Sequence, residues 1–140
     1  MVLIICVDNN FGTMFNSRRQ SQDKLLRERI IELSRKSKLW MNHYSEKQFE
    51  GHNILNLNVS DNFINEAQNG EFCFVEKENA ANFEALVEII VLYKWNCSYP
   101  FDETFAIDLK KWKCVETNDF EGSSHKKITE EIYVKNYEEI

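Results

Sequence analysis

The sequence contains few of the residues that interrupt or cross-link a chain. Of its 140 residues, one is proline and four are glycine, too few for a disordered or linker-rich chain. The four cysteines, Cys6, Cys73, Cys97 and Cys114, form no CxxC pair, which excludes common zinc-ribbon and thioredoxin-like motifs. Cys6 and Cys73 lie inside apolar runs, and we interpret them as small buried residues in a reducing compartment.

Long hydrophobic runs and an excess of positive charge are also absent. The N-terminal run VLIICV is too short for a membrane span or a signal peptide, and no basic segment precedes it. The net charge of −6 disfavours nucleic-acid binding, which needs clustered Lys and Arg. The one basic cluster starts at Arg18 and Arg19 and is diluted by Glu28 and Glu32, as on a solvated helix face. We expect a cytoplasmic protein with neither a membrane nor a nucleic-acid partner.

Motifs for metal binding and nucleophilic catalysis are missing from the sequence. His43, His52 and His125 have no metal-ligand spacing with Cys, Asp or Glu, so no metal site is expected. No GxSxG or P-loop occurs. The segment GSSHKK (122–127) places serines beside a histidine, but a hairpin loop is the preferred interpretation.

The sequence does contain an ordered series of apolar strands and amphipathic helices. The run at 2–7 predicts a central strand buried on both faces, followed by a polar loop at 8–20. Ser21 is the expected N-cap of a helix from about 22 to 35. Because early strands alternate with helices and late strands follow one another, we expect one α/β domain, 1–140, with an antiparallel C-terminal edge. Further strands are expected at 38–41, 53–59, 71–76, 88–96, 103–109, 112–120 and 127–136, and further helices at 45–50, 60–67 and 78–87.

Aromatic residues make up 13% of the chain, enough for a core rich in large side chains. Trp40, Tyr93, Trp95 and Trp112 are expected in that core and in the wall of any cleft. Strand 88–96 is a candidate edge for association between copies, although nothing in the sequence selects an oligomeric state.

Taken in order, these segments resemble dihydrofolate reductase over nearly the whole chain. The resemblance implies a mixed sheet with flanking helices and an antiparallel C-terminal hairpin, shortened by one strand and helix segment. Its clearest part is the C-terminal third. The matching segments are LIICVDNNFG (3–12), QDKLLRERI (22–30), VLYKWNCSYPFDETF (91–105), Trp112, DFEGSSH (119–125) and EEIYVKN (130–136).

At the cofactor site that the resemblance implies, the sequence departs from the family. Asn42 and His43 stand where the family has Gly-Arg, and Glu76, Lys77 and Glu78 occupy the region of its glycine pair. Side chains there prevent the close backbone approach that only glycine permits. Each glutamate would repel a diphosphate by about 3 kcal/mol at ~5 Å and an effective dielectric constant near 20. No cofactor is therefore expected, and NADPH would bind only if the protein is a divergent reductase.

At the substrate site that the resemblance implies, the sequence stays closer to the family's pattern. Asp23 matches the family's carboxylate that binds the pterin ring, and Thr104 matches the threonine that hydrogen-bonds this carboxylate. Cys6 and Leu26 are expected to line the same cleft. The alternative is that Asp23 only stabilises the first helical turn, by roughly 0.3–1 kcal/mol, and that Thr104 is simply a good strand former.

The function favoured by these observations is a catalytically inactive, reductase-like binding or regulatory protein. Its expected ligand is a pterin, folate-like or nucleotide heterocycle near Asp23 and Thr104, or a protein partner. One alternative is a divergent reductase in which Asp23 orients the pterin, and another is an interaction or inhibitor protein encoded by a mobile element. The sequence is also similar to small bacterial proteins labelled ribonuclease Z. The histidine-rich motif on which that enzyme's metal chemistry depends is absent.

Overall fold

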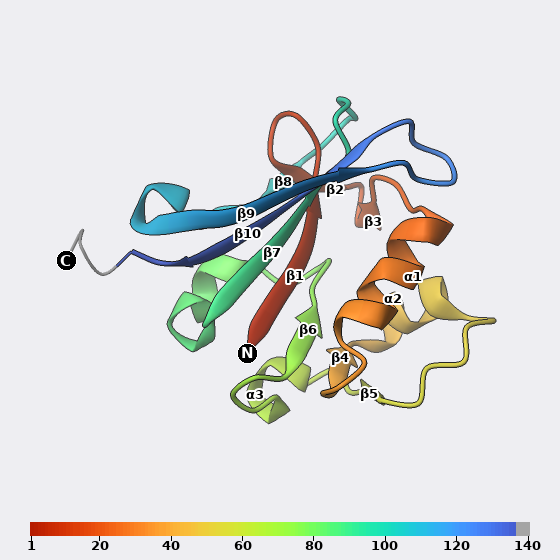
Figure 1. Ribbon diagram of the computed structural model, residues 1–140, viewed down its shortest axis with the longest axis vertical. Coiled ribbons are helices and arrows are strands. Elements are labelled where there is room, and N and C mark those ends of the chain that lie inside the picture. Colours follow the sequence, from red (N-terminus) through yellow and green to blue (C-terminus); the bar gives the residue numbers. More distant parts are fainter. Residues whose placement is uncertain (137–140) are drawn as a thin grey trace.

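The computed structural model describes residues 1–136, which are built around a seven-stranded mixed sheet (Figure 1). The strand order is β5-β4-β6-β1-β7-β10-β9. The first five strands are parallel, and β10 pairs antiparallel with both β7 and β9. The expected α/β class with an antiparallel C-terminal edge is confirmed. The strands are β1 (Val2–Val7), β4 (Leu39–Met41), β5 (Leu57–Val59), β6 (Phe72–Phe74), β7 (Ile89–Lys94), β9 (Trp112–Phe120) and β10 (Ile128–Lys135).

A second, three-stranded sheet consists of β3 (Arg18–Arg19), β2 (Gly12–Phe15) and β8 (Glu103–Thr104). The expectation that 8–20 is only a loop was wrong. Asn16 and Ser17 both adopt positive φ, 52° and 59°, and two such residues form the tight turn that joins antiparallel strands. These strands are too short to show a hydrophobic period, and β2 gains its second partner from β8, far along the chain.

The longest helix among the described residues is α1 (Lys24–Leu33), and Asp23, not Ser21, is its N-cap. Asp23 has extended backbone angles, and its side chain accepts hydrogen bonds from the backbone N–H groups of Leu25 and Leu26. The expected helix at 78–87 is a 3₁₀ segment, η2, interrupted by non-helical angles at Phe83. The remaining helical segments are α2 (His43–Glu46), η1 (Lys47–Phe49), α3 (Phe63–Glu66), η2 (Ala80–Leu86) and η3 (Leu109–Lys111).

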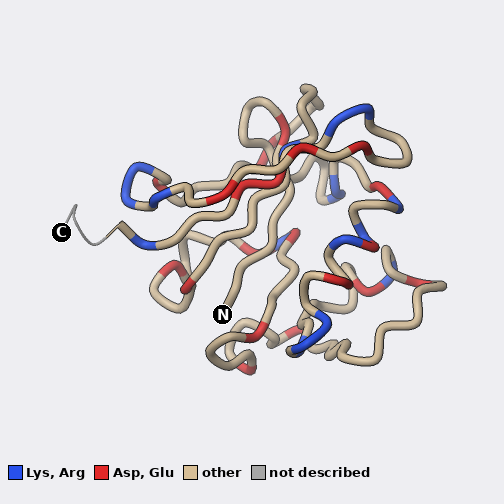
Figure 2. The backbone as a smooth tube through the Cα atoms, viewed as in Figure 1, with Lys and Arg blue, Asp and Glu red and all other residues tan. Residues whose placement is uncertain are grey.

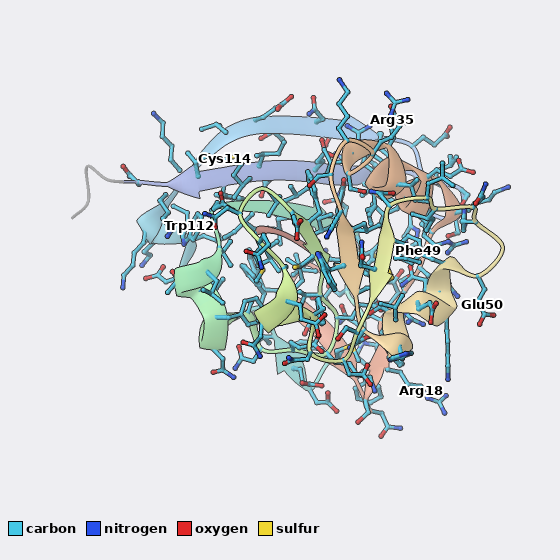
Figure 3. The ribbon with its side chains drawn as sticks, turned by 90° about the horizontal axis from the view of Figure 1, so that it is seen from below. Arg18, Arg35, Phe49, Glu50, Trp112 and Cys114 are labelled. Carbon is cyan, nitrogen blue, oxygen red and sulfur yellow. The ribbon has the colours of Figure 1, made fainter. Side chains whose placement is uncertain are left out.

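The main sheet carries an apolar cluster on each face, as the uninterrupted apolar run at 2–7 predicts. Leu3 and Ile5 of β1 pack in the cluster that contains Phe83 of η2. Val2 and Ile4 pack in the other cluster, with Leu26 and Ile30 of α1. Alternate residues of a strand point to opposite faces, so β1 is buried by both layers. Phe49 points into the protein, whereas the adjacent Glu50 points outward (Figure 3).

Strand β7 lies inside the sheet between β1 and β10, so the expectation that it forms an edge was wrong. A strand with two largely apolar faces fits an interior position because both faces can then be covered. The outer strands are β5 and β9, and Cys114 of β9 is exposed (Figure 3). The four aromatic side chains expected in the core are buried: Trp40, Tyr93, Trp95 and Trp112.

Candidate functional site

The carboxylate of Asp23 is the most heavily hydrogen-bonded acidic group of the candidate site. Asp23 is only 2% exposed. Besides capping α1, it accepts backbone hydrogen bonds from Ser123, at 3.0 Å to Oδ1, and from Ser124, at 2.9 Å to Oδ2. Both serine hydroxyls donate to it as well, each at 3.2 Å. The loop between β9 and β10 therefore closes over the start of α1, as Figure 1 shows for these two segments.

These contacts determine the charge state of Asp23. Burial alone would raise the pKa of its carboxyl group. Hydrogen bonds from His125 and from the backbone of Ser123, Ser124 and Leu26 outweigh burial and hold this pKa well below its usual range. Asp23 is therefore an ionised carboxylate with every oxygen engaged, and it acts as an acceptor for fixed donors.

His125 connects Asp23 to a second group of side chains. Its Nδ1 lies 2.9 Å from Asp23 Oδ2, and its Nε2 lies 3.0 Å from Ser21 Oγ and 3.1 Å from the hydroxyl of Tyr99. The imidazole stacks on Trp95 with ring centroids 4.5 Å apart. The segment 122–127 lies in the loop between two paired strands, so the hairpin interpretation is confirmed. The loop nevertheless carries a histidine that contacts a serine from another part of the chain.

The other residues expected on the substrate side lie in three different settings. Cys6 is half-buried and borders a small cavity of about 20 Å³ together with Ser21 and Trp95. Leu26 is buried in the apolar cluster beneath α1. Thr104 is exposed on β8, opposite Gly12, and lines an open groove of about 450 Å³. Within the described chain, the hydrogen-bond partners of the Asp23 carboxylate come from 25–26 and 123–125, and Thr104 is not one of them.

The residues that stand at the implied cofactor site follow strands β4 and β6, which end side by side. These strands are parallel neighbours, so the segments after Met41 and Phe74 meet at one end of the sheet. The Glu76 carboxylate accepts two hydrogen bonds from Arg19, at 2.8 and 3.0 Å. It accepts two more from Ser45 Oγ at 2.8 Å and from Gln48 at 3.1 Å. An acidic side chain, 9% exposed, thus occupies this polar pocket.

The other residues at the implied cofactor site, Asn42, His43 and Lys77, contact side chains close to them. Asn42 is the N-cap of α2, and its amide nitrogen donates to Glu78 at 2.9 Å. His43 is exposed and lies 3.0 Å from Asp61. Lys77 Nζ lies 4.1 Å from the centre of the Tyr44 ring, a cation–π contact.

Sequence reasoning missed two contributors to these clusters. Arg19 was assigned to a solvated basic face, but its guanidinium pairs with Glu76 and lies 4.4 Å from the centre of the Tyr44 ring. Ser21 was assigned to helix capping, but its hydroxyl contacts His125. The Arg19–Glu76 and Ser21–His125 contacts each span more than fifty positions, and no local pattern encodes such a separation. Within residues 1–136, no group of three or more His, Cys, Asp or Glu side chains is arranged to bind a metal ion.

The comparisons with known proteins support the fold. No protein-family profile matches the chain, and no curated protein matches it. Among solved structures, the chain is similar to dihydrofolate reductase from Enterococcus faecalis complexed with NADP(H) and RAB-propyl. The TM-score is 0.68 at 12% sequence identity, over 96% of this chain and 95% of that chain. The chain therefore has a dihydrofolate-reductase-like fold. None of the helices in the described part is long and apolar enough to span a membrane.

Proposed function

We propose that this chain is a binding or regulatory protein that retains the reductase-like fold and does not bind NADPH in the manner of dihydrofolate reductase. The observation that carries the proposal is the position of the Glu76 carboxylate at the end of β6. In the implied cofactor site, this region faces the diphosphate. Here it presents an acid with four hydrogen-bond donors already directed at it.

The electrostatics of this pocket favour the acid over an added anion. In the described structure, Arg19 is the cation paired with Glu76, and its Nε and one terminal nitrogen both donate to that carboxylate. A diphosphate would have to displace Glu76 from Arg19, Ser45 and Gln48, or lie beside it. At ~5 Å and an effective dielectric constant near 20, each unit of like charge costs about 3 kcal/mol. Glu78, which accepts a hydrogen bond from Asn42, adds a second negative charge nearby.

The Asp23 side supports binding of a ligand more than reduction of a pterin. The backbone N–H groups of Ser123 and Ser124 supply a pair of adjacent donors to its two oxygens. A 2-amino-4-oxo heterocycle would offer the same kind of donor pair, so it has to displace this loop before it reaches the carboxylate. A small heterocyclic ligand therefore binds by exchange with the chain's own loop, and a protein partner is the other class of occupant.

Thermal melts of the purified protein with NADPH, dihydrofolate or an antifolate, alone and in pairs, test this proposal. A ligand at 100 times its dissociation constant stabilises the fold by about 2.7 kcal/mol, which is a shift of several degrees for a chain of this size. We expect no shift with NADPH. A shift with antifolate that is lost in Asp23→Asn would identify a retained heterocycle site.

A matched pair of variants makes the NADPH test sharper. Glu76→Gln with Glu78→Gln removes both negative charges from the pocket. Glu50→Gln with Glu121→Gln changes the net charge equally at two exposed positions. NADPH binding that appears only in the first variant would support the proposed role of Glu76. Stabilisation of the unmodified protein by NADPH, followed by NADPH-dependent reduction of dihydrofolate, would establish the divergent reductase instead.

A further inference from the structure

We propose that Ser21, His125 and Asp23 form a nucleophilic triad that transfers small acyl groups from esters to the Ser21 hydroxyl and then to water. This inference goes beyond the proposed binding role and does not depend on it. It rests on a continuous chain of contacts, from Ser21 Oγ to His125 Nε2 at 3.0 Å and from His125 Nδ1 to Asp23 Oδ2 at 2.9 Å. A triad of this kind is identified by its geometry and the role of each group, whatever the order of its residues in the sequence.

The hydrogen bond to Asp23 determines which nitrogen of the neutral imidazole carries the proton. An ionised carboxylate only accepts hydrogen bonds, so Nδ1 of His125 donates to Asp23. The lone pair of Nε2 then faces Ser21 Oγ and is available to remove its proton. This tautomer is the one that a general base needs.

The ring of His125 is held in place from several directions. Trp95 stacks on it at an interplanar angle of 27°, and the side chain of His125 is only 8% exposed. The hydroxyl of Tyr99 donates to Ser21 Oγ at 3.3 Å. Burial raises the pKa of Tyr99, so its phenol stays protonated and acts as a neutral hydrogen-bond donor. The base and the nucleophile are therefore both positioned by neighbouring side chains.

The cysteine that borders the same cavity is inactive as a nucleophile at neutral pH. Cys6 borders the same cavity as Ser21. Burial and the adjacent negative charge of Glu76 raise the pKa of the Cys6 thiol far above its usual value. The thiolate, not the thiol, is the reactive form, so Cys6 does not replace Ser21.

The surroundings of Ser21 limit the substrate to a small acyl group. The cavity beside Ser21 has a volume of about 20 Å³, which is room for one water-sized group. Tyr99 also borders an open groove of about 330 Å³, lined in addition by Pro100 and Arg18, where a leaving alcohol has space. An acetyl ester matches this combination, because its methyl group is water-sized and can enter the cavity while the alcohol lies in the groove.

The reaction proceeds in two balanced steps. Ser21 Oγ attacks the ester carbonyl carbon while its proton passes to His125 Nε2, the bond from carbon to the alcohol oxygen breaks, and the alcohol leaves with that proton. Water then attacks the acyl-serine with His125 again as base, which releases the carboxylic acid and restores Ser21. Asp23 contacts no substrate and acts as a positioning residue for the imidazole.

A fluorophosphonate probe tests the nucleophile directly. Ser21 Oγ would form a bond to phosphorus, fluoride would leave, and the serine proton would pass to His125. The folded wild-type protein is labelled, digested and mapped by mass spectrometry, and hydrolysis of p-nitrophenyl acetate is measured in parallel. We expect one label on the peptide that contains Ser21, and none after denaturation in urea.

Variants complete the test. His125→Gln and Ser21→Ala should slow labelling at least about 100-fold, in line with loss of a general base or of the nucleophile. Ser98→Ala, at an exposed serine of the same region, should label at the wild-type rate. Absence of label on the folded wild type, or a label mapped to another residue, would overturn the proposal. The mapping uses the wild-type chain, so it decides the matter even if a variant fails to fold.

Discussion

The side chains of Asp23 and His125 lie 102 positions apart in the sequence and meet at 2.9 Å, where the loop between β9 and β10 covers the start of helix α1. The Asp23 carboxylate therefore has two structural roles. Asp23 ends the extended segment before α1 by capping the helix, and it anchors the C-terminal hairpin loop. Acidic residues on the neighbouring strands β9 and β10 lie next to each other (Figure 2).

Replacing Asp23 by alanine should destabilise the fold by about 3 kcal/mol. Loss of a helix cap accounts for about 1 kcal/mol, and loss of the charge-assisted hydrogen bonds that the N–H groups of Ser123 and Ser124 donate to the carboxylate accounts for about 2 kcal/mol. The free energy of unfolding in urea measures the loss. Asp108 caps η3 at an exposed position, and in the described structure its carboxylate accepts only from the backbone N–H of Lys110. Asp108→Ala should therefore cost about 1 kcal/mol or less, and an equal loss in the two variants would contradict the anchoring role.

Stability should decrease in acid, partly through Asp23. Its pKa in the folded state lies below the unfolded value of about 3.9, so its contribution is fully present above about pH 4 and is lost as the pH falls further. Asp8 and Glu130 also have lowered pKa values: burial raises each, but hydrogen bonds outweigh burial. Urea unfolding at a series of pH values from 7 to 3 should show a smaller decrease for Asp23→Asn than for the wild type. Parallel pH curves for the two proteins would count against this linkage.

Arg29→Met should cost about 2 kcal/mol. Arg29 donates to both oxygens of Glu130, at 2.7 and 3.0 Å, and the Glu130 side chain is only 5% exposed. Loss of the partner leaves a buried carboxylate uncompensated, and partial exposure of Arg29 keeps the penalty below that of a fully buried pair.

Two comparisons check the Arg29 prediction by urea unfolding. Addition of Glu130→Gln to Arg29→Met should recover part of the stability because the unpaired charge is gone. Arg35→Met removes an arginine whose pair with Glu32 is exposed on both sides, at 66% and 68%, and should change stability by less than about 0.5 kcal/mol. If Arg35→Met were as costly as Arg29→Met, burial would not be the relevant difference.

Gly122→Ala should destabilise the protein by about 2 kcal/mol. A Cβ atom at this position would collide with the Asp23 carboxylate and come within 2.9 Å of Ile128 Cδ1, so the loop would have to move. The control is Gly70→Ala, where a Cβ meets no atom within 4 Å and only the positive φ of 78° is strained. That variant should lose about 1 kcal/mol. A melting temperature for Gly122→Ala at or above that of Gly70→Ala would show that the loop does not depend on close approach to Asp23.

Much of the fold could be predicted because its signals are local. The buried central strand at 2–7, the antiparallel C-terminal strands and the buried aromatic residues follow from apolar runs and their order. The sheet at β2, β3 and β8 could not be predicted, because its strands are two to four residues long and pair across the chain. The N-cap was placed two residues too early because Ser21 and Asp23 are both suitable caps, and the loop from 123–125 selects Asp23.

The sequence by itself determined the class of fold and the presence of acidic side chains where the reductase resemblance implies a cofactor, because both depend on residue type along a continuous segment. Only the tertiary structure decided the partners of those side chains. Arg19 meets Glu76 across 57 positions, and Ser21 meets His125 across 104. Such contacts form when packing of strands and helices brings distant segments within hydrogen-bond range, and no short-range pattern in the chain specifies which polar groups will then meet.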